Sequence, residues 1–111
     1  MRICVLLMRT AFSEEDSGRL FGLIRHAVGS NIAIYLLGDG VLLARKGQKG
    51  YHADGINEAL SKGAKVFACS RDLRARGIPS GEIEARIEVT DDLEGVFIED
   101  AMENAGRVFS W

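Results

Sequence analysis

The sequence predicts an α/β protein, a three-layer α/β/α sandwich built on a five-stranded, mainly parallel sheet. Short, continuous apolar runs such as Arg2–Met8 and Asn31–Leu37 are typical of strands buried on both faces of a parallel sheet. Amphipathic stretches with helical spacing lie between these runs, and this alternation favours β-α-β units with right-handed crossovers. Together the patterns predict one sheet covered by helices on both faces.

Length and composition favour a single domain over residues 1–111. Hydrophobic residues make up 47% of the chain and charged residues 27%, which is close to the average of globular proteins and argues against disorder. The formal net charge of −2 argues against direct binding of nucleic acid. The longest apolar runs, Ile3–Met8 and Ile32–Leu37, are far shorter than the ~20 residues that cross a membrane, so no membrane contact is expected.

The chain has two cysteines, Cys4 and Cys69, and they bear on compartment and metal binding. Two are too few for a disulfide scaffold, and they lie too far apart in sequence for a zinc site. The segment Met1–Cys4 enters a strand pattern with no signal-peptide cleavage site behind it. We therefore expect a cytoplasmic protein that holds no metal.

The first helix is expected to follow the strand Arg2–Met8. Ser13 and Asp16 have the spacing of a capping box, in which two side chains satisfy free amides at a helix start. Gly29 is expected to end this helix. The apolar residues between these signals recur at helical spacing: Leu20, Leu23, Ile24, Ala27 and Val28.

The middle of the chain repeats the alternation of strand and helix. Gly38–Gly40 interrupts the second strand, and Asp39 is expected to cap a short helix over Val41–Ala44. A second amphipathic helix is expected over Asp54–Lys62, and a third strand over Lys65–Cys69.

The last third of the chain completes the pattern. A short helix is expected over Ser70–Arg76, ended by Gly77. Arg86–Thr90 is expected to be a half-covered strand, because its apolar residues alternate with charged ones. A helix over Asp91–Asn104 then leads into a fifth strand at Arg107–Trp111. The inner face of this last helix is expected to comprise Leu93, Val96, Phe97 and Ala101.

In parallel sheets, ligands and reactive groups gather at the carboxyl ends of the strands. The expected strands place four segments there: Arg9–Phe12, Gly38–Gly40, Cys69–Arg71 and Thr90–Asp92. Candidate functional residues are therefore sought in and around these segments.

Cys69 is the leading candidate, because it ends a strand and directly precedes a helix start. The free amides and the positive dipole end at such a position favour the thiolate, and the thiolate is the form that attacks sulfane sulfur. Ser70 and Arg71, which open the helix, are expected to support it. The alternative is a small apolar residue packed at the end of a buried strand, which is also the role expected for Cys4.

Two further features allow both a functional and a structural interpretation. Gly38–Gly40 lacks the third glycine of a dinucleotide fingerprint, with Leu43 in its place, so a tight turn capped by Asp39 is favoured over a cofactor site. No cofactor is expected. His52 lies in an expected loop and, as an imidazole, is suited to carry a proton for the Cys69 thiol. A loop histidine without that role is the alternative.

The segment Ala64–Ile78, AKVFACSRDLRARGI, resembles the DsrE/DsrF-like family, including its TusD and YchN-like branches. Members share a strand that ends in a cysteine, followed by a short helix of the form x-x-x-Leu-x-x-x-Gly. The stretch Tyr35–Val41 is similar to the second strand and turn of that family, and the order of elements fits along the whole chain.

This resemblance implies sulfur relay and a possible sulfurtransferase. The matching residue, Cys69, is expected to accept sulfane sulfur as a persulfide and pass it on, so sulfur donor and acceptor proteins are the implied partners. The implied assembly is a homo-oligomer, a trimer or hexamer, or a hetero-oligomer of related subunits. The alternatives are a non-catalytic oligomeric interaction module and a small-ligand-binding protein of the same fold.

Self-association is also expected from the size of the chain. A short α/β chain leaves apolar surface uncovered. Phe109 and Trp111, at the end of the chain, are the candidates for a subunit contact.

Overall fold

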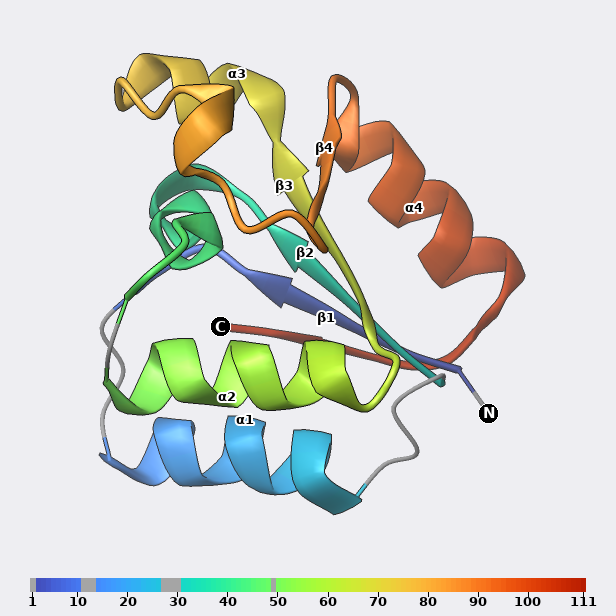
Figure 1. Ribbon diagram of the computed structural model, residues 1–111. Coiled ribbons are helices and arrows are strands. Elements are labelled where there is room, and N and C mark those ends of the chain that lie inside the picture. Colours follow the sequence, from blue (N-terminus) through green and yellow to red (C-terminus); the bar gives the residue numbers. More distant parts are fainter. Residues whose placement is uncertain (1, 11–13, 27–30, 49) are drawn as a thin grey trace.

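The computed structural model describes residues 2–10, 14–26, 31–48 and 50–111. Within these ranges strands alternate with helices (Figure 1). The strands are β1 (Arg2–Leu7), β2 (Ile32–Leu36), β3 (Lys65–Cys69), β4 (Glu88–Thr90) and β5 (Ala105–Ser110). The helices are α1 (Glu14–His26), α2 (Tyr51–Ser61), α3 (Ser70–Ala75) and α4 (Leu93–Glu103), with 3-10 helices η2 (Gly38–Ala44) and η3 (Ser80–Glu82).

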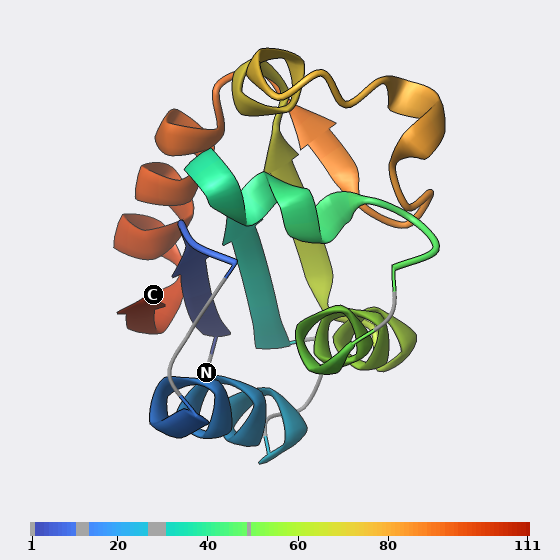
Figure 2. The same ribbon diagram turned by 90° about the vertical axis from the view of Figure 1, so that its left-hand side faces the viewer.

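These strands form one parallel sheet in the order β4-β3-β2-β1-β5. The chain builds the sheet outward from β1 to β4 and then returns across it to place β5 on the other side of β1. Helices α1 and α2 cover one face, and α4 covers the opposite face (Figures 1 and 2). The crossovers between parallel strands are right-handed, and the chain reverses its direction along the sheet between β4 and β5. The helix that makes the return therefore lies on the opposite face from the helices that come before it. The predicted three-layer architecture is therefore confirmed, and the sheet is parallel throughout.

The inner strands carry the core, as their continuous apolar runs predict. Cys4, Val5 and Leu7 of β1 are fully buried, and every residue of β2 is buried as well. Leu20 and Ile24 of α1 pack into the same core. The edge strand β4 is exposed along most of its length, in keeping with the expected half-covered strand.

Two helices begin earlier than the sequence patterns predict. α2 begins at Tyr51 rather than Asp54, so His52 lies in a helix and not in a loop. η2 begins at Gly38 rather than Val41.

The prediction that Asp39 caps the short helix is wrong. The residue at the N-cap position of η2 is Leu37, and no side chain caps this helix. Asp39 lies inside its first turn, where its carboxylate accepts two hydrogen bonds from the Arg76 guanidinium group (2.8 and 3.0 Å). A tertiary ion pair has therefore taken the place of the expected local cap.

Two glycines fit η2 against the end of β1. Gly38 has a φ of +56°, a conformation that strains residues with a side chain. At Gly40 a Cβ atom would lie 2.1 Å from the carbonyl oxygen of Leu7. Gly38 thus permits the backbone conformation and Gly40 the close approach, and together they let η2 pass close to the carboxyl end of the sheet (Figure 2).

The inner face of α4 differs in part from the expected one. Leu93 is fully buried and Phe97 is half-buried, as predicted. Val96, however, is 37% exposed, while the charged residue Asp100 is only 8% exposed. The helix therefore turns a carboxylate toward the sheet.

The Asp100 carboxylate fastens α4 to β1 and β2. It accepts hydrogen bonds from the Tyr35 hydroxyl (2.5 Å) and the Cys4 thiol (3.5 Å), and it pairs with the Arg2 guanidinium group (2.9 Å). Burial by itself would raise the pKa of Asp100, but the hydrogen bonds from Tyr35, Arg2 and Asn104 hold that pKa below its usual value. Burial, and then the neighbouring Asp100, raises the pKa of the Cys4 thiol to about 11.

Some predictions fall outside the described residues. They are the helix start at Ser13, the helix end at Gly29, the inward-facing Ala27 and Val28, and the end of the segment Arg9–Phe12.

Candidate functional site

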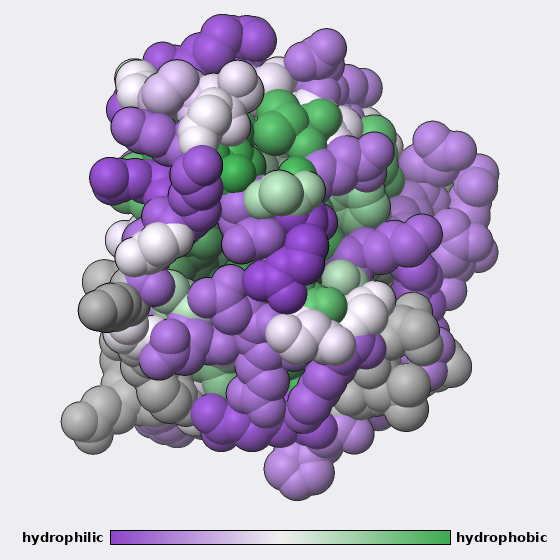
Figure 3. Space-filling model, viewed as in Figure 1, coloured by the Kyte–Doolittle hydropathy of each residue, from purple (hydrophilic) through white to green (hydrophobic). Residues whose placement is uncertain are grey.

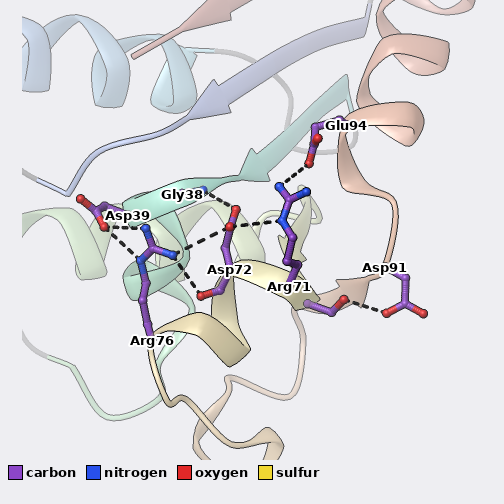
Figure 4. Close-up of polar contacts among 8 residues, drawn as sticks. Gly38, Asp39, Arg71, Asp72, Arg76, Asp91 and Glu94 are labelled. Carbon is purple, nitrogen blue, oxygen red and sulfur yellow. Dashed lines mark hydrogen bonds and ion pairs between the residues drawn. The ribbon is translucent and has the colours of Figure 1, made fainter.

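The carboxyl ends of β2, β3 and β4 meet at one edge of the sheet, as predicted, because the register places their last residues side by side. Two hydrogen bonds join the segments that follow them (Figure 4). The Gly38 amide donates to Asp72 Oδ2 (2.7 Å), and the Ser70 hydroxyl donates to Asp91 Oδ1 (2.7 Å). Residues far apart in the chain thus form one polar cluster around the start of α3.

Cys69 lies at the centre of this edge, as the last residue of β3 and the N-cap residue of α3. Its side chain does not cap the helix, but the thiol lies close enough to Asp72 to help lower the pKa of that carboxyl group. Only 1% of Cys69 is exposed. Sulfur exchange with another protein needs a reachable sulfur atom, so α3 or its neighbours must move before Cys69 can react.

Asp72 connects the parts of the cluster. Its carboxylate accepts a hydrogen bond from the Gly38 amide and pairs with the guanidinium groups of Arg71 (3.6 Å) and Arg76 (3.9 Å). Burial by itself would raise the pKa of Asp72, but the Gly38 amide, then the thiol and then the two arginines hold it below its usual value. Asp72 is therefore ionised at neutral pH.

Two surface ion pairs hold α3 from either side. Arg71 binds Glu94 of α4 (2.9 Å), and Arg76 binds Asp39 of η2 (2.8 Å). Glu94, followed by Asp72 and Cys69, raises the pKa of Arg71. The Arg71 and Asp39 side chains are 63% and 66% exposed, and such exposed pairs contribute only about 0–1 kcal/mol each. The cover over Cys69 is thus held more weakly than the core.

An apolar cavity of about 210 Å³ lies beside α3. Its apolar walls are Leu73, Ile78, Ile83 and Val89, and Ser70 adds a polar edge. Figure 3 shows hydrophobic side chains gathered over α3 and β4 within a mostly hydrophilic surface. Because Ser70 follows Cys69 directly, this open space lies next to the segment that covers the sulfur.

The structure gathers the predicted residues around Cys69 with one exception, His52. The Nε2 atom of His52 lies 2.9 Å from the Ser17 hydroxyl, and its ring packs beside Phe21 at 5.6 Å. It lines a different cavity, of about 310 Å³, together with residues of η2 and α2. Its part in proton transfer stays a prediction.

Sequence reasoning missed the acidic half of the cluster. Asp91 lies in a segment predicted for this edge, but Asp72 and Glu94 were not identified as candidates. One signal was available for Asp72: it lies three residues after Cys69, the spacing at which side chains near a helix start face one another. No comparable signal exists for Glu94, because its partner Arg71 is 23 residues away in sequence.

The described residues show neither a membrane segment nor a metal centre. None of their helices is both long and apolar enough to cross a bilayer. No three side chains of His, Cys, Asp or Glu in the described ranges gather as they would around a metal ion.

A model of the DsrH-like protein family matches residues 13–105. The chain belongs to the DsrH-like family. This match confirms the resemblance carried by Ala64–Ile78 and places the protein in a family of sulfur-relay proteins. No match was found among curated proteins.

Solved structures similar to this DsrH-like protein share its fold. A protein of unknown function from Methanobacterium thermoautotrophicum is 18% identical, with a TM-score of 0.75 over 97% of both chains. The YchN protein of E. coli is 20% identical, with a TM-score of 0.69 over the full length of both chains (100% each). A conserved protein of unknown function from Bacteroides thetaiotaomicron is 22% identical, with a TM-score of 0.63 over 98% of this chain and 94% of its own.

Proposed function

We propose that this DsrH-like protein is a sulfur carrier in which Cys69 accepts sulfane sulfur as a persulfide and relays it to a partner protein. One observation carries the proposal. In this member of a sulfur-relay family, Cys69 ends β3 and is the sole cysteine at the carboxyl edge of the described sheet. It lies near the charged residues Arg71 and Asp72. The partners are a sulfur donor and a sulfur acceptor, and the proposed compartment is the cytoplasm.

The proposed exchange needs no oxidant, reductant or cofactor. The Cys69 thiolate attacks the outer sulfur of a donor persulfide, the sulfur–sulfur bond of the donor breaks, and the donor cysteine leaves as a thiolate. The outer sulfur is then bound to Cys69. An acceptor thiolate attacks this outer sulfur in turn, and Cys69 is released as a thiolate. Arg71 supplies positive charge beside Cys69 in both steps.

Binding of a donor or acceptor is proposed to uncover the sulfur by displacing α3. Two ion pairs at the protein surface and one partly buried hydrogen bond join the start and end of α3 to other elements: Arg71–Glu94, Arg76–Asp39 and Ser70–Asp91. A partner that offers charged groups of its own can replace such contacts at little cost. The apolar cavity beside α3 provides space for the displaced residues.

The test is to incubate the protein with a persulfide donor and weigh it intact. We expect the wild type and Cys4→Ser to gain one sulfur atom and Cys69→Ser to gain none. Cys4→Ser is the matched control, because Cys4 is also buried and also lies beside a carboxylate. No gain on the wild type, or an equal gain on Cys69→Ser, would contradict the proposal.

A second function, a non-catalytic interaction module, is favoured by the 1% exposure of Cys69. In that case Cys69 is a packed core residue, and the protein serves as a subunit that holds others in an assembly. The rate at which a thiol reagent modifies folded Cys4→Ser separates the two functions. Modification only after unfolding supports the module, whereas modification of the folded protein supports the relay.

A further inference from the structure

A polar cavity of about 310 Å³ lies between η2, the residue Thr10 after β1, and the first residues of α2. η2 and α2 contact each other at this corner of the molecule (Figures 1 and 2). Thr10, Arg45 and His52 contribute polar groups to the lining, and Leu42 and Leu43 contribute apolar ones. No described residue lines both this cavity and the apolar cavity beside α3. The two cavities are therefore separate sites.

The charge of the polar cavity is positive. Arg45 carries a permanent positive charge and is exposed, so an incoming ligand can reach its guanidinium group. No described acidic side chain pairs with Arg45, whereas Arg71, Arg76 and Arg86 each pair with a carboxylate. None of the described residues in the lining is acidic, and Asp54, in the first turn of α2, lies outside it. The cavity therefore favours an anion over a cation.

Neighbouring contacts hold the lining in place. The Gln48 side-chain amide donates hydrogen bonds to the carbonyl oxygens of Leu42 (2.7 Å) and Arg45 (2.9 Å). These bonds tie the loop after η2 to the end of that helix. The Nε2 atom of His52 lies 2.9 Å from the Ser17 hydroxyl of α1, which fixes the imidazole ring from the other side. A lining that is ordered before the ligand arrives loses less entropy on binding.

We propose that this cavity binds a small molecule that carries a tetrahedral oxyanion, either a phosphate or a sulfur oxyanion. The polar groups come from three segments of the chain: Thr10 follows β1, Arg45 follows η2 and His52 lies in α2. Polar groups that approach from several sides suit a group with three acceptor oxygens better than a planar carboxylate with two. The Arg45 guanidinium group can bind two of these oxygens at once.

The apolar part of the lining indicates what the rest of the ligand is like. Leu42, Leu43 and Ala53 lie beside the polar groups, and Leu43 and Ala53 are buried. A cavity of about 150 Å³ is enough to hold a benzene ring, so the volume of about 310 Å³ can hold both an oxyanion and a compact apolar body. We therefore expect a ligand with a ring-sized apolar body attached to the oxyanion.

The experiment is titration calorimetry in a buffer free of phosphate and sulfate. Three probes share a phenyl ring and differ in the anionic group: phenyl phosphate, benzenesulfonate and benzoate. We expect phenyl phosphate or benzenesulfonate to bind at one site per chain. Benzoate should bind about tenfold more weakly, because it lacks the third acceptor oxygen. The tighter of the first two probes identifies the oxyanion as a phosphate or a sulfur oxyanion.

Two variants remove polar groups from the lining separately. Arg45→Gln removes the positive charge, and the affinity for the tighter probe should fall about tenfold or more, as expected for a lost hydrogen bond to a charged group. Thr10→Val keeps the shape of the side chain and removes its hydroxyl, and the affinity should fall about fivefold. Lys46→Gln is the matched control. It removes the same charge from the next residue, which does not line the cavity, and it should bind the probe as the wild type does.

Several outcomes would overturn the inference. They are no binding of either tetrahedral probe; benzoate binding as tight as theirs; an unchanged affinity in Arg45→Gln; and an equal loss in Lys46→Gln, which would indicate a general attraction of anions to a basic surface. Circular dichroism checks the folding of each variant. If Arg45→Gln unfolds, Arg45→Lys takes its place, since it keeps the charge but loses the two-oxygen contact and should also bind the probe more weakly.

This inference does not rest on sulfur relay, because Cys69 does not line the cavity. A protein that gains no sulfur from a persulfide donor would contradict the proposed function and leave the oxyanion site standing. A protein that binds none of the probes but gains one sulfur atom on Cys69 would do the reverse.

Discussion

The two cysteines of this DsrH-like protein have neighbours of the same kind but covers of different strength. Cys4 contacts the carboxylate of Asp100, with Arg2 beside it. Cys69 lies near the carboxylate of Asp72, whose pKa it helps to lower, and Arg71 pairs with that carboxylate. Both thiols are almost completely buried. Burial alone therefore does not distinguish a structural cysteine from a candidate reactive one.

The difference lies in what holds each cover in place. Over Cys4 the cover is α4, which is fastened by the buried Asp100 carboxylate and by the buried side chain of Leu93. Over Cys69 the cover is α3, which has six residues, buries Ser70 and Leu73, and is fastened to η2 and α4 by ion pairs of partly exposed side chains. Water and salt compete with the second kind of contact but not with the first. We expect the region around Cys69 to open while the region around Cys4 stays closed.

The largest expected effect comes from breaking the contacts around Cys4. Asp100→Ala leaves Arg2 and Tyr35 without their buried partner, and removing one partner of a buried pair typically costs about 3 kcal/mol. The free energy of unfolding, measured in urea, should fall by about this amount. Asp39→Ala is the matched control, because it removes an exposed carboxylate from an ion pair, and it should cost less than about 1 kcal/mol. Equal losses would refute the proposed difference between the two covers.

An intermediate effect is expected at alkaline pH. The pKa of the Cys4 thiol is raised from 9.0 to about 11, so the unfolded chain releases this proton at a lower pH than the folded protein. The stabilisation is therefore fully present below pH 9 and is lost as the pH rises through 11. Between these values the free energy of unfolding of the wild type should fall by about 2 kcal/mol more than that of Cys4→Ala.

The matched control for this pH dependence is Cys69→Ala, which keeps Cys4 and should follow the wild type. A decline that persists in Cys4→Ala would show that other groups cause it. Urea unfolding at a series of alkaline pH values provides the measurement.

The smallest expected effect is a change in the rate at which Cys69 is modified when one exposed ion pair of its cover is removed. Asp39→Asn removes the ion pair with Arg76, and the rate at which a thiol reagent modifies Cys69 should rise about fivefold or less, because an exposed pair contributes at most about 1 kcal/mol. Adding salt should raise the same rate in the wild type, since exposed charges are screened. The rates are measured in Cys4→Ala, so that Cys69 is the reacting thiol. In Cys69→Ala, modification of Cys4 should be insensitive to both changes, and a response there would contradict the comparison.

The fold was largely predictable, because strands buried on both faces need continuous apolar residues wherever they lie in the sheet. The third strand has the predicted bounds, Lys65–Cys69. The starts of α2 and η2 were less predictable. Helix ends depend on contacts with other elements, and at η2 the carboxylate of Asp39 reaches Arg76 instead of a local amide.

The candidate site was predictable only in part. Cys69, Ser70 and Arg71 follow from the end of a strand and the start of a helix, which are local features. Asp72 and Glu94 join them through long-range contacts, and His52 lies elsewhere because α2 begins at Tyr51. Phe109 and Trp111 were identified from the sequence as candidates for a subunit contact, and the structure shows both partly buried against the core.

By itself the sequence determined the layers, the order of the elements and the position of Cys69 at a strand end, because hydrophobic periodicity and helix signals act over a few neighbouring residues. Only the tertiary structure decided that both thiols are covered and which contacts hold each cover. Those contacts join groups far apart in the chain, 34 residues for Gly38 and Asp72 and 96 for Cys4 and Asp100, and no local pattern encodes which distant residues meet.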